Sequence, residues 1–331
     1  MTRVGVIMPA YQAASLLDRS LKPLLEISGE VPVLVVDPGS VDGTSDKARE
    51  LGAEVLELGR RAGPAEARNE GVRRMQDVDV VLFIDCDCVV HPDVLERVRA
   101  AFDGDPNLVS LTGSYDDTPP ERNFASLYMN LRHHFVHQRA RTEDASFWAG
   151  CGAVRKEAFE RVGGFDADKY PRPMIEDIEL GHRLAPSGAM RLDPELHVTH
   201  LKRWTLGSVV HTDIFCRAFP WSRLILESGH LPNDLNVSAR ERVAAVFAAL
   251  SIASALTGVG MLFWNAGAGL FFLGLAAVLP FSLGGELFRF FRERAGLGFA
   301  LGAFAFHQIH LTYSAVVFAI CKLQSLAGGK R

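Results

Sequence analysis

A run of five apolar residues that leads directly into two carboxylates constrains this chain more than any other feature. The run is Val80 to Ile84, and Asp85 and Asp87 follow it with one residue between them. A short apolar run rich in β-branched and aromatic residues predicts a strand that is buried on both faces. Ligands bind beyond the carboxyl ends of the strands in open α/β sheets, so we expect Asp85 and Asp87 to lie at a ligand-binding edge.

Two carboxylates at such an edge favour a hard divalent cation. Mg²⁺-like ions take one or two carboxylates and complete their coordination with the phosphate oxygens of a substrate. Buried carboxylates without a positive partner are also costly. An Asp-x-Asp is nevertheless a short pattern, and alone it favours an acidic turn that is only solvated.

The order of predicted elements favours an α/β fold with a largely parallel sheet. Apolar strand-like segments alternate with helix-like segments at short spacing, which is typical of βαβ units. The strand-like segments are 4–8, 31–36, 54–58, 80–84 and 108–111, and the helix-like segments are 16–25, 45–51, 64–75, 93–102 and 124–141.

Charge is distributed unevenly along the 331 residues. No charged residue lies between Arg242 and Glu286, and none lies between Arg294 and Lys322. We therefore predict a soluble portion at 1–204, an interfacial amphipathic segment at 205–240 and a transmembrane region at 241–331. The net charge of −4 gives no indication of a nucleic-acid partner.

Three apolar segments are candidates for membrane spans: 243–263, 267–283 and 297–321. Basic residues at 289, 292 and 294 favour the cytoplasmic side, and so do those at 322, 330 and 331. Three crossings cannot place both groups in the cytoplasm, so either the third segment is bent or the C-terminal charges are overruled.

The N-terminus leads directly into the strand-like Val4 to Met8 without a secretory signal. The five cysteines have scattered spacing that predicts neither a disulfide framework nor a metal site. We therefore expect the soluble portion to face the cytoplasm, where thiols remain reduced.

Two further stretches carry site signals. Gly150 and Gly152 lie in a segment of small residues where a ligand could approach the backbone closely. Glu176 and Asp177 begin a predicted helix, whose dipole stabilises carboxylates in the first turn and which could face a cleft.

Several short motifs follow one another along the chain. They are Pro9-Ala10-Tyr11, Val36-Asp37, Gly39-Ser40-Val41-Asp42-Gly43-Thr44, Ala67-Arg68-Asn69, Asp85-Cys86-Asp87, Arg155-Lys156, Gly163-Gly164-Phe165 and Glu176-Asp177. In this order the motifs resemble the family 2 glycosyltransferases of the GT-A fold over residues 3 to 205. The C-terminal apolar segments resemble those of membrane-bound members such as ceramide glucosyltransferase and the polysaccharide synthases.

The resemblance implies a role for each matching residue on the donor side. Pro9 and Tyr11 would line the nucleotide pocket, Asp37 would bind the base or ribose, and Arg68 would help to hold the nucleotide. Asp85 would approach the ribose or the metal. Asp87 would ligate the Mg²⁺ or Mn²⁺ that bridges the diphosphate.

The resemblance also implies a base and an acceptor side. Asp177 would be the general base, with Glu176 as the rival candidate. His200 to Trp204 resembles the family's Gln-x-x-Arg-Trp motif with His200 in place of Gln, so His200 is a metal ligand, a diphosphate contact or a structural residue. Arg203 would contact the diphosphate, and Trp204 and Gly152 would contact the acceptor.

The sequence thus predicts a GT-A domain that binds a nucleoside diphosphate sugar, with uridine diphosphate as the expected carrier. One cation and one separate base predict a single displacement with inversion. The acceptor would be a hydroxyl of a lipid or lipid-linked saccharide at the cytoplasmic face of a bacterial-type plasma membrane. Alternatives are transfer to a polyprenyl phosphate and a non-catalytic membrane scaffold. A dinucleotide-binding oxidoreductase is disfavoured, because no Gly-x-Gly-x-x-Gly follows the first strand.

Overall fold

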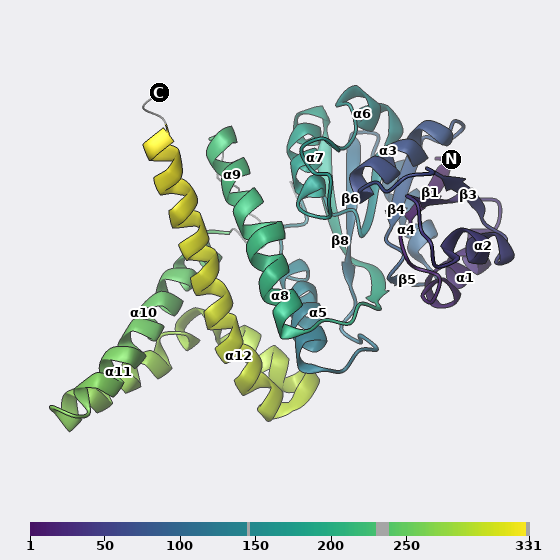
Figure 1. The fold of residues 1–331 in the computed structure, drawn as a ribbon. Helices are drawn as coiled ribbons and strands as arrows, with labels where there is room; N and C mark the ends of the chain where they lie inside the picture. Colours follow the sequence, from purple (N-terminus) through teal and green to yellow (C-terminus); the bar gives the residue numbers. More distant parts are fainter. Residues whose placement is uncertain (144–145, 230–237, 329–331) are drawn as a thin grey trace. The chain divides into compact units, whose positions relative to one another are not determined.

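The structure is a computed structural model that describes residues 1–143, 146–229 and 238–328. The chain divides into two compact units, which are described in turn (Figure 1). The first unit comprises Met1–Arg122 and Val136–Arg203, and the second comprises Asn123–Phe135 and Trp204–Arg331.

The first unit is built on a mixed sheet, which within the described residues has eight strands in the order β3-β2-β1-β4-β7-β6-β8-β5. Strands β3, β2, β1 and β4 are parallel, whereas β7 runs antiparallel to both β4 and β6, and β5 runs antiparallel to β8. The strands are β1 (Val4–Pro9), β2 (Val33–Asp37), β3 (Glu54–Glu57), β4 (Val80–Ile84), β5 (Cys88–Val90), β6 (Leu108–Tyr115), β7 (Cys151–Arg155) and β8 (Ala189–His200).

The prediction of a largely parallel sheet is therefore correct as far as β4. Beyond β4 the sheet is mixed, because β6 and β8 pair in parallel while β7 and β5 run antiparallel to their neighbours. Parallel neighbours require a crossover, which the alternating helices supply as far as β4. Beyond that point the strand β7 enters between β4 and β6 in the opposite direction, and no local sequence pattern specifies the direction of such a pairing.

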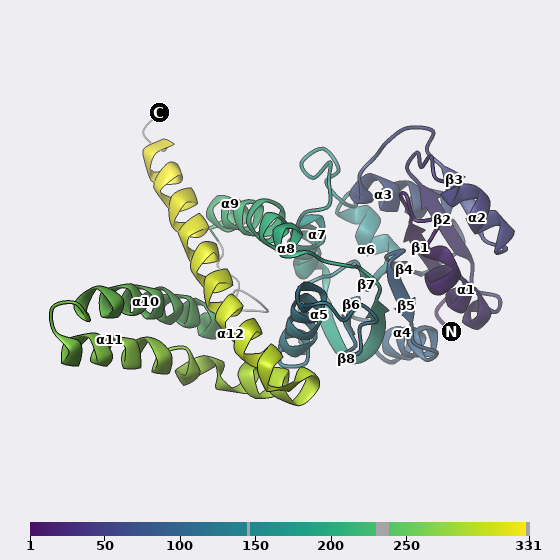
Figure 2. The ribbon, with the colours of Figure 1, turned by 60° about the horizontal axis from the view of Figure 1, so that its bottom comes forward.

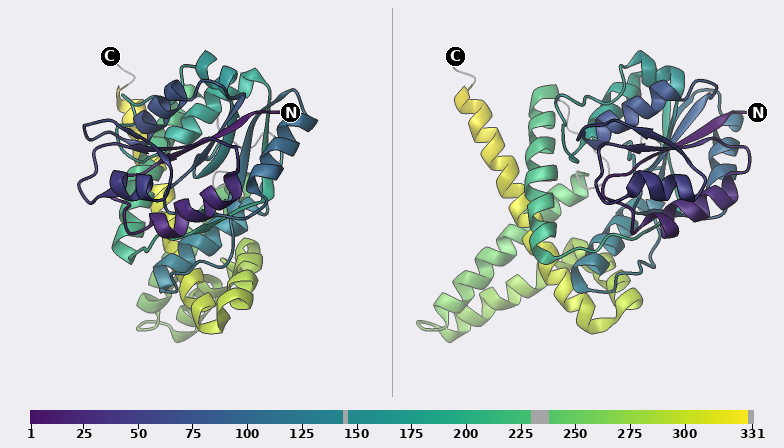
Figure 3. Two further views of the ribbon diagram at one scale, coloured as in Figure 1. Left: turned by 90° about the vertical axis from the view of Figure 1, so that its right-hand side faces the viewer. Right: turned by 45° about the vertical axis from the view of Figure 1, so that its right-hand side comes forward.

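Helices cover both faces of this sheet (Figure 3), because successive strand residues point to opposite sides. In β4, Leu82 and Ile84 pack into one core and Val81 and Phe83 into the other. The first core is closed by α1 (Leu17–Ser28), α2 (Thr44–Glu50) and α4 (Val94–Gly104), and the second by α3 (Pro64–Arg74), α6 (Lys156–Arg161) and α7 (Glu176–Leu184), which continues into a 3₁₀ turn at Ala185–Ser187.

Strand register brings several predicted site residues to one edge of the sheet. Pro9 pairs with Val36 and Ile7 pairs with Phe83, so the carboxyl ends of β1, β2 and β4 lie side by side. The residues that enter β7 meet the end of β4, because Ile84 pairs with Cys151. The edge predicted to bind ligand is thus assembled from four strands.

The second unit is helical. Its buried core joins the start of α5 to the loop before α8 and to both parts of α12, through residues that include Tyr128, Trp204, Val209, Phe291 and Ala300. Its helices are α5 (Phe124–His137, shared with the first unit), α8 (Leu206–His211), the π-helix η2 (Thr212–Ala218), α9 (Phe219–Ser228), α10 (Ala239–Met261), α11 (Ala266–Val278) and α12 (Phe281–Gly328).

Two glycine-dependent features shape the C-terminal helices. Helices α10 and α11 lie side by side as a hairpin (Figure 2), and a Cβ atom on Gly258 of α10 would lie 3.0 Å from the Gly269 carbonyl oxygen of α11. Helix α12 is interrupted at Gly296, which has φ 82° and ψ 171°. The two parts of α12 meet through aromatic rings, with Phe288 and Phe304 at a centroid distance of 5.6 Å.

Two helices in the described residues, α10 and the long α12, are long and apolar enough to cross a membrane by length and composition. Of the three membrane spans that we expected, two are therefore supported by helix length and composition. Helix α11 has 13 residues, or about 20 Å at 1.5 Å per residue, which is shorter than a hydrocarbon layer of about 30 Å. The bend anticipated within the third segment lies at Gly296, immediately before it.

Candidate active site

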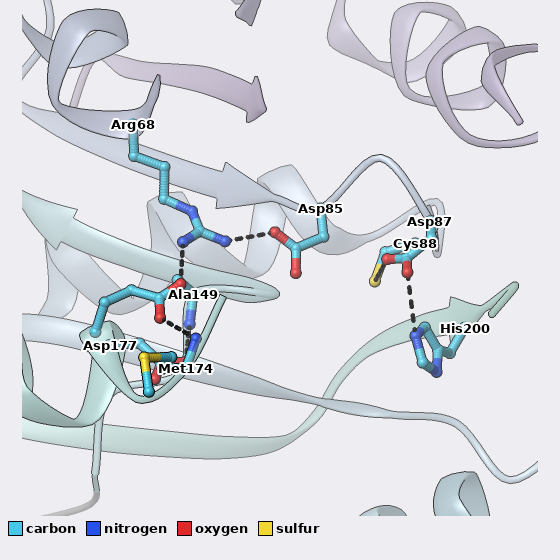
Figure 4. A network of polar contacts seen from close by, with 9 residues as sticks. Arg68, Asp85, Asp87, Cys88, Ala149, Met174, Asp177 and His200 are labelled. Carbon is cyan, nitrogen blue, oxygen red and sulfur yellow. Dashed lines mark hydrogen bonds and ion pairs between the residues drawn. The ribbon is translucent and has the colours of Figure 1, made fainter. Parts of the chain in front are cut away.

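Arg68 connects two acidic groups from opposite ends of the predicted site (Figure 4). Its Nη2 donates to Asp85 Oδ1 at 2.6 Å, and its Nη1 donates to Glu176 Oε1 at 3.3 Å. The side chains of Arg68 and Glu176 are 5% and 7% exposed, while that of Asp85 is 33% exposed. A buried guanidinium paired with two carboxylates avoids the cost of an isolated buried charge.

The backbone before β7 makes a second connection between the two ends of the site. The amide of Asp85 donates to the carbonyl of Gly150 at 3.2 Å, and the amide of Ala149 donates to Asp177 Oδ2 at 3.3 Å. Asp85 and Asp177 therefore contact adjacent residues of one segment. The structure brings the predicted nucleotide edge and the predicted base into one region.

Asp87 has a different partner from Asp85. His200 Nε2 lies 3.4 Å from Asp87 Oδ2, and the imidazole of His200 stacks on the ring of Tyr115 with centroids 4.2 Å apart. His200 is placed there because the end of β8 pairs with Cys88, the residue after Asp87. The sequence pointed to both His200 and Asp87, but their proximity depends on this antiparallel pairing.

The carboxylates of the site differ in how readily they ionise. Burial raises the pKa of Asp177 to about 7, the nearby charge of Glu176 adds to this effect, and the charge of Arg68 opposes it. Burial also raises the pKa of Asp85, although Arg68 counteracts it. For Asp87, burial is outweighed by the hydrogen bond and charge of His200, so its pKa lies below the ordinary value.

The remaining donor-side residues lie near the same edge. The Tyr11 ring is exposed, and the guanidinium of Arg61 lies 5.5 Å from its centroid. Asp37 is buried, and its carboxylate accepts hydrogen bonds from the Ser40 amide at 2.8 Å and the Ser45 hydroxyl at 2.6 Å. Asp37 thus orders its own loop, and its contact with a base or ribose stays a prediction.

Arg203 was predicted to contact the diphosphate, and Trp204 and Gly152 were predicted to contact the acceptor. Arg203 is exposed and lies 3.9 Å from Glu121, whereas Trp204 is 5% exposed and buried in the core of the second unit. Gly152 lies within β7, where a Cβ atom would come within 2.3 Å of the Trp148 carbonyl oxygen. Close packing therefore explains this glycine, and the acceptor contacts of Gly152 and Trp204 stay predictions.

Two contributors to the site, Tyr115 and Ala149, were missed in the sequence. Tyr115 ends β6 and supports His200, and the Ala149 amide holds Asp177. Gly150 was singled out for close approach of a ligand, whereas in the structure its carbonyl accepts the Asp85 amide. The available signal for Tyr115 was an aromatic residue at the end of an apolar strand. The backbone contacts had no signal, since any residue type can supply them.

The donor set suits a cation that takes most of its ligands from a substrate. Among the described residues, no three His, Cys, Asp or Glu side chains are gathered closely enough to hold a metal ion by themselves. Asp87 and Asp85 nevertheless supply carboxylate oxygens at the sheet edge, and His200 supplies an imidazole nitrogen beside Asp87. Mg²⁺-like ions are bound in this way when substrate phosphates complete the shell.

Comparison with known proteins gives information on the family and the fold. Residues 5–163 match the family model described as "Glycosyl transferase family 2". Validoxylamine A glucosyltransferase of Streptomyces hygroscopicus subsp. jinggangensis is 28% identical over 222 residues, which are 56% of this chain and 52% of that protein. Glycosyltransferase AglE of Haloferax volcanii is 32% identical over 109 residues, 30% of this chain and 36% of that protein.

The chain spans about half and about a third of the lengths of these two relatives. Among solved structures, the mannosyltransferase PcManGT from Pyrobaculum calidifontis, in complex with GDP-Man and Mn²⁺, matches with a TM-score of 0.57. That match has 19% identity and covers 100% of this chain and 88% of the other. The identity is low, so the likeness concerns the fold.

Proposed function

We propose, from the premise that this chain carries a family 2 glycosyltransferase domain, that it moves a sugar from a nucleoside diphosphate sugar to a hydroxyl group with inversion. The observation that carries the proposal is the pair of connections between Asp85 and the Glu176-Asp177 pair, through Arg68 and through Ala149-Gly150. Inverting transfer needs a donor site and a proton acceptor in one cleft.

On the donor side, Pro9, Tyr11 and Asp37 would contact the nucleoside. Asp87, Asp85 and His200 would hold Mg²⁺ or Mn²⁺, which when bound neutralises the charge of the departing diphosphate. The GDP-Man and Mn²⁺ of the solved mannosyltransferase support a nucleotide sugar and a divalent ion as the class of ligand. Uridine diphosphate is the carrier that we expect, and Arg203 would add a contact to the diphosphate.

Asp177 is the better candidate for the general base, because the carboxylate of Glu176 is already occupied by other hydrogen bonds. Glu176 is committed to Arg68 and to the Met174 amide, which donates to its Oε2 at 2.8 Å. Among the described residues, the hydrogen bonds that Asp177 accepts come from the backbone amides of Ala149 and Ile178. A pKa near 7 matches a proton acceptor that works at neutral pH.

The second unit supports attachment to a membrane. Helices α10 and α11 expose large apolar side chains along their length, including Val246, Leu256, Leu270 and Phe271. An exposed apolar surface of this extent on two adjacent helices favours contact with lipid. We therefore propose that the acceptor is a lipid or a lipid-linked saccharide, with Trp204 and Gly152 on the acceptor side and the catalytic domain in the cytoplasm.

The test is a donor-hydrolysis and transfer screen with membranes that contain the full chain. Sugar nucleotides based on UDP and GDP are supplied with Mn²⁺ or Mg²⁺ and a lipid extract. We expect metal-dependent release of the nucleoside diphosphate, with transfer of label into the lipid fraction. No turnover of any donor would contradict the proposal and favour a scaffold.

The Asp177→Asn variant then separates two classes of acceptor. A hydroxyl acceptor needs a base, so transfer should fall by about 10²- to 10⁴-fold while nucleotide binding is retained. A polyprenyl phosphate acceptor is already anionic, so retention of transfer by this variant would contradict the hydroxyl assignment.

A further inference from the structure

The single guanidinium of Arg68 is shared between groups with different predicted tasks. Asp85 belongs to the sheet edge that we assign to the donor, whereas Glu176 begins the helix that carries Asp177. Both carboxylates contact the same planar group through different nitrogen atoms. If the Arg68–Asp85 pair becomes stronger, the guanidinium moves toward Asp85 and the Arg68–Glu176 pair becomes weaker, and the reverse also holds.

Arg68 is held between these partners by a second layer of contacts. The ring of Phe165 lies 5.4 Å from its guanidinium carbon. Phe165 is fixed in turn by Asn69, whose side chain donates to the Phe165 carbonyl at 2.8 Å and accepts from the Phe165 amide at 2.9 Å. Helix α3 thus supplies both the arginine and the residue that orders the surface beneath it.

A change in the Arg68–Glu176 pair would affect the residues on either side of Glu176. Its second carboxylate oxygen accepts the Met174 amide, so it also anchors the segment before α7. Asp177 is the next residue, and its carboxylate is held by the Ala149 amide. A shift of Glu176 would therefore move both the anchored segment and the proposed base.

We propose that Arg68 is a positioning residue that couples the donor edge at Asp85 to the placement of Glu176 and Asp177. Donor binding and correct placement of the base then depend on each other through one shared ion-pair network. This inference rests on the proposed function, because it assumes that Asp85 lies at the donor site. Arginine suits the task because its rigid fork bridges two carboxylates, whereas the ammonium of lysine is a single point charge.

A double-mutant cycle tests the coupling without relying on turnover. Binding of Mn²⁺ with UDP, and of Mn²⁺ with GDP, is measured by titration calorimetry on the full chain in detergent. Glu176→Gln should weaken binding on the order of fivefold to tenfold, because Arg68 then pairs wholly with Asp85 and neutralises it. In the Arg68→Lys background the same substitution should change binding by less than about twofold.

Glu179→Gln is the matched control. Glu179 lies on the same helix α7 and also pairs with an arginine, Arg183, at 2.6 Å, but this pair is separate from the Arg68 network that includes Asp85. Its substitution should leave nucleotide binding unchanged in both backgrounds. Thermal unfolding of each variant verifies that the chain is folded.

The possible results separate the two proposals. If the wild-type chain binds neither nucleotide with Mn²⁺, the proposed function fails and the coupling fails with it. If the wild-type chain binds but Glu176→Gln has no effect, or has the same effect in both backgrounds, the coupling alone is overturned. A smaller effect in the Arg68→Lys background supports it.

Discussion

Asp177 has two kinds of neighbour that act on its protonation in opposite directions. Burial and the charge of Glu176 favour the neutral form, whereas Arg68 and the backbone amides of Ala149 and Ile178 favour the ionised form. The balance leaves its pKa at about 7, above the ordinary value of 3.8. A carboxylate that resists ionisation in the folded chain carries a free-energy cost once it is ionised.

This balance predicts how stability depends on pH. Because the folded pKa is raised, the contribution of Asp177 is fully present below the unfolded pKa near 4 and is lost as pH rises through about 7. The loss is at most about 4 kcal/mol, from three units at 1.36 kcal/mol each. We expect Asp177→Asn to reduce the fall in unfolding temperature between pH 5 and pH 8, measured without nucleotide or divalent ions.

Asp168→Asn is the control for this measurement, since Asp168 is an exposed aspartate of the same unit. It should behave as the wild type does at both pH values. If Asp177→Asn showed the same pH dependence as the wild type, the raised pKa of Asp177 would have to be abandoned.

At the level of elements, the bend in α12 depends on one backbone conformation. Gly296 has φ 82° and ψ 171°, a region that is essentially restricted to glycine. Gly296→Ala should therefore destabilise the second unit by about 1–3 kcal/mol. Gly298→Ala, two residues later in regular helix with open space at its Cβ position, should be neutral or stabilising by up to about 1 kcal/mol.

The unfolding temperatures of the two glycine variants are measured in detergent. They show whether the effect of the substitution depends on the backbone conformation at residue 296 or follows from replacing any glycine in α12. The prediction requires the substitution at 296 to be clearly worse than the one at 298. Equal effects would mean that the bend does not depend on the glycine conformation.

The π-helix η2 places Asp213 in the interior of the second unit. Its carboxylate lies 2.9 Å from His310 Nδ1 and accepts the Tyr313 hydroxyl at 2.8 Å, and Arg217 donates to it at 3.1 Å. Two of these three partners belong to α12. The carboxylate therefore fixes η2 against α12 through a satisfied buried network.

Removal of this carboxylate should be costly. Asp213→Ala removes the carboxylate that Arg217, His310 and Tyr313 share. Because Arg217 is 40% exposed and can be solvated, we expect a loss of about 2–3 kcal/mol. Tyr313→Phe removes the contacts of the hydroxyl with Asp213 and with His310 Nδ1 and should cost about 1–2 kcal/mol. Chemical denaturation in detergent measures both variants, and a loss for Asp213→Ala no larger than that for Tyr313→Phe would show that the network is not a stabilising unit.

Elements with a strong local pattern were predictable, and those that depend on distant partners were not. Strand β4 was identified because both of its faces are apolar. Strand β8 alternates buried and partly exposed residues from Ala189 to His200, but Pro194 interrupts the pattern, and only its C-terminal end was singled out. The Arg68 ion pairs join residues 17 and 108 positions apart, so no local pattern reveals them.

For the molecule as a whole, the uneven charge noted in the sequence corresponds to two units with different surfaces. The first unit encloses its apolar residues in two cores on either side of the sheet. In the second unit, α10 and α11 bury few residues, among them Ala248, Ser251, Gly258 and Gly269. In water such an exposed apolar surface would promote association, whereas in a bilayer it is the expected state of a lipid-facing hairpin.

This difference predicts how the full chain partitions. The wild type should remain in the membrane pellet after a wash with alkaline carbonate, which strips proteins held by charge alone. A double variant, Leu256→Asp with Leu270→Asp, should lower the amount of folded chain in that pellet, because a carboxylate in an apolar lipid-facing helix costs up to about 3 kcal/mol. Val41→Glu changes an exposed apolar residue of the first unit and should leave partitioning unchanged. A double variant that is folded in the membrane pellet to the same extent as the wild type would mean that α10 and α11 do not face lipid, and the proposal of a lipid acceptor would lose this support.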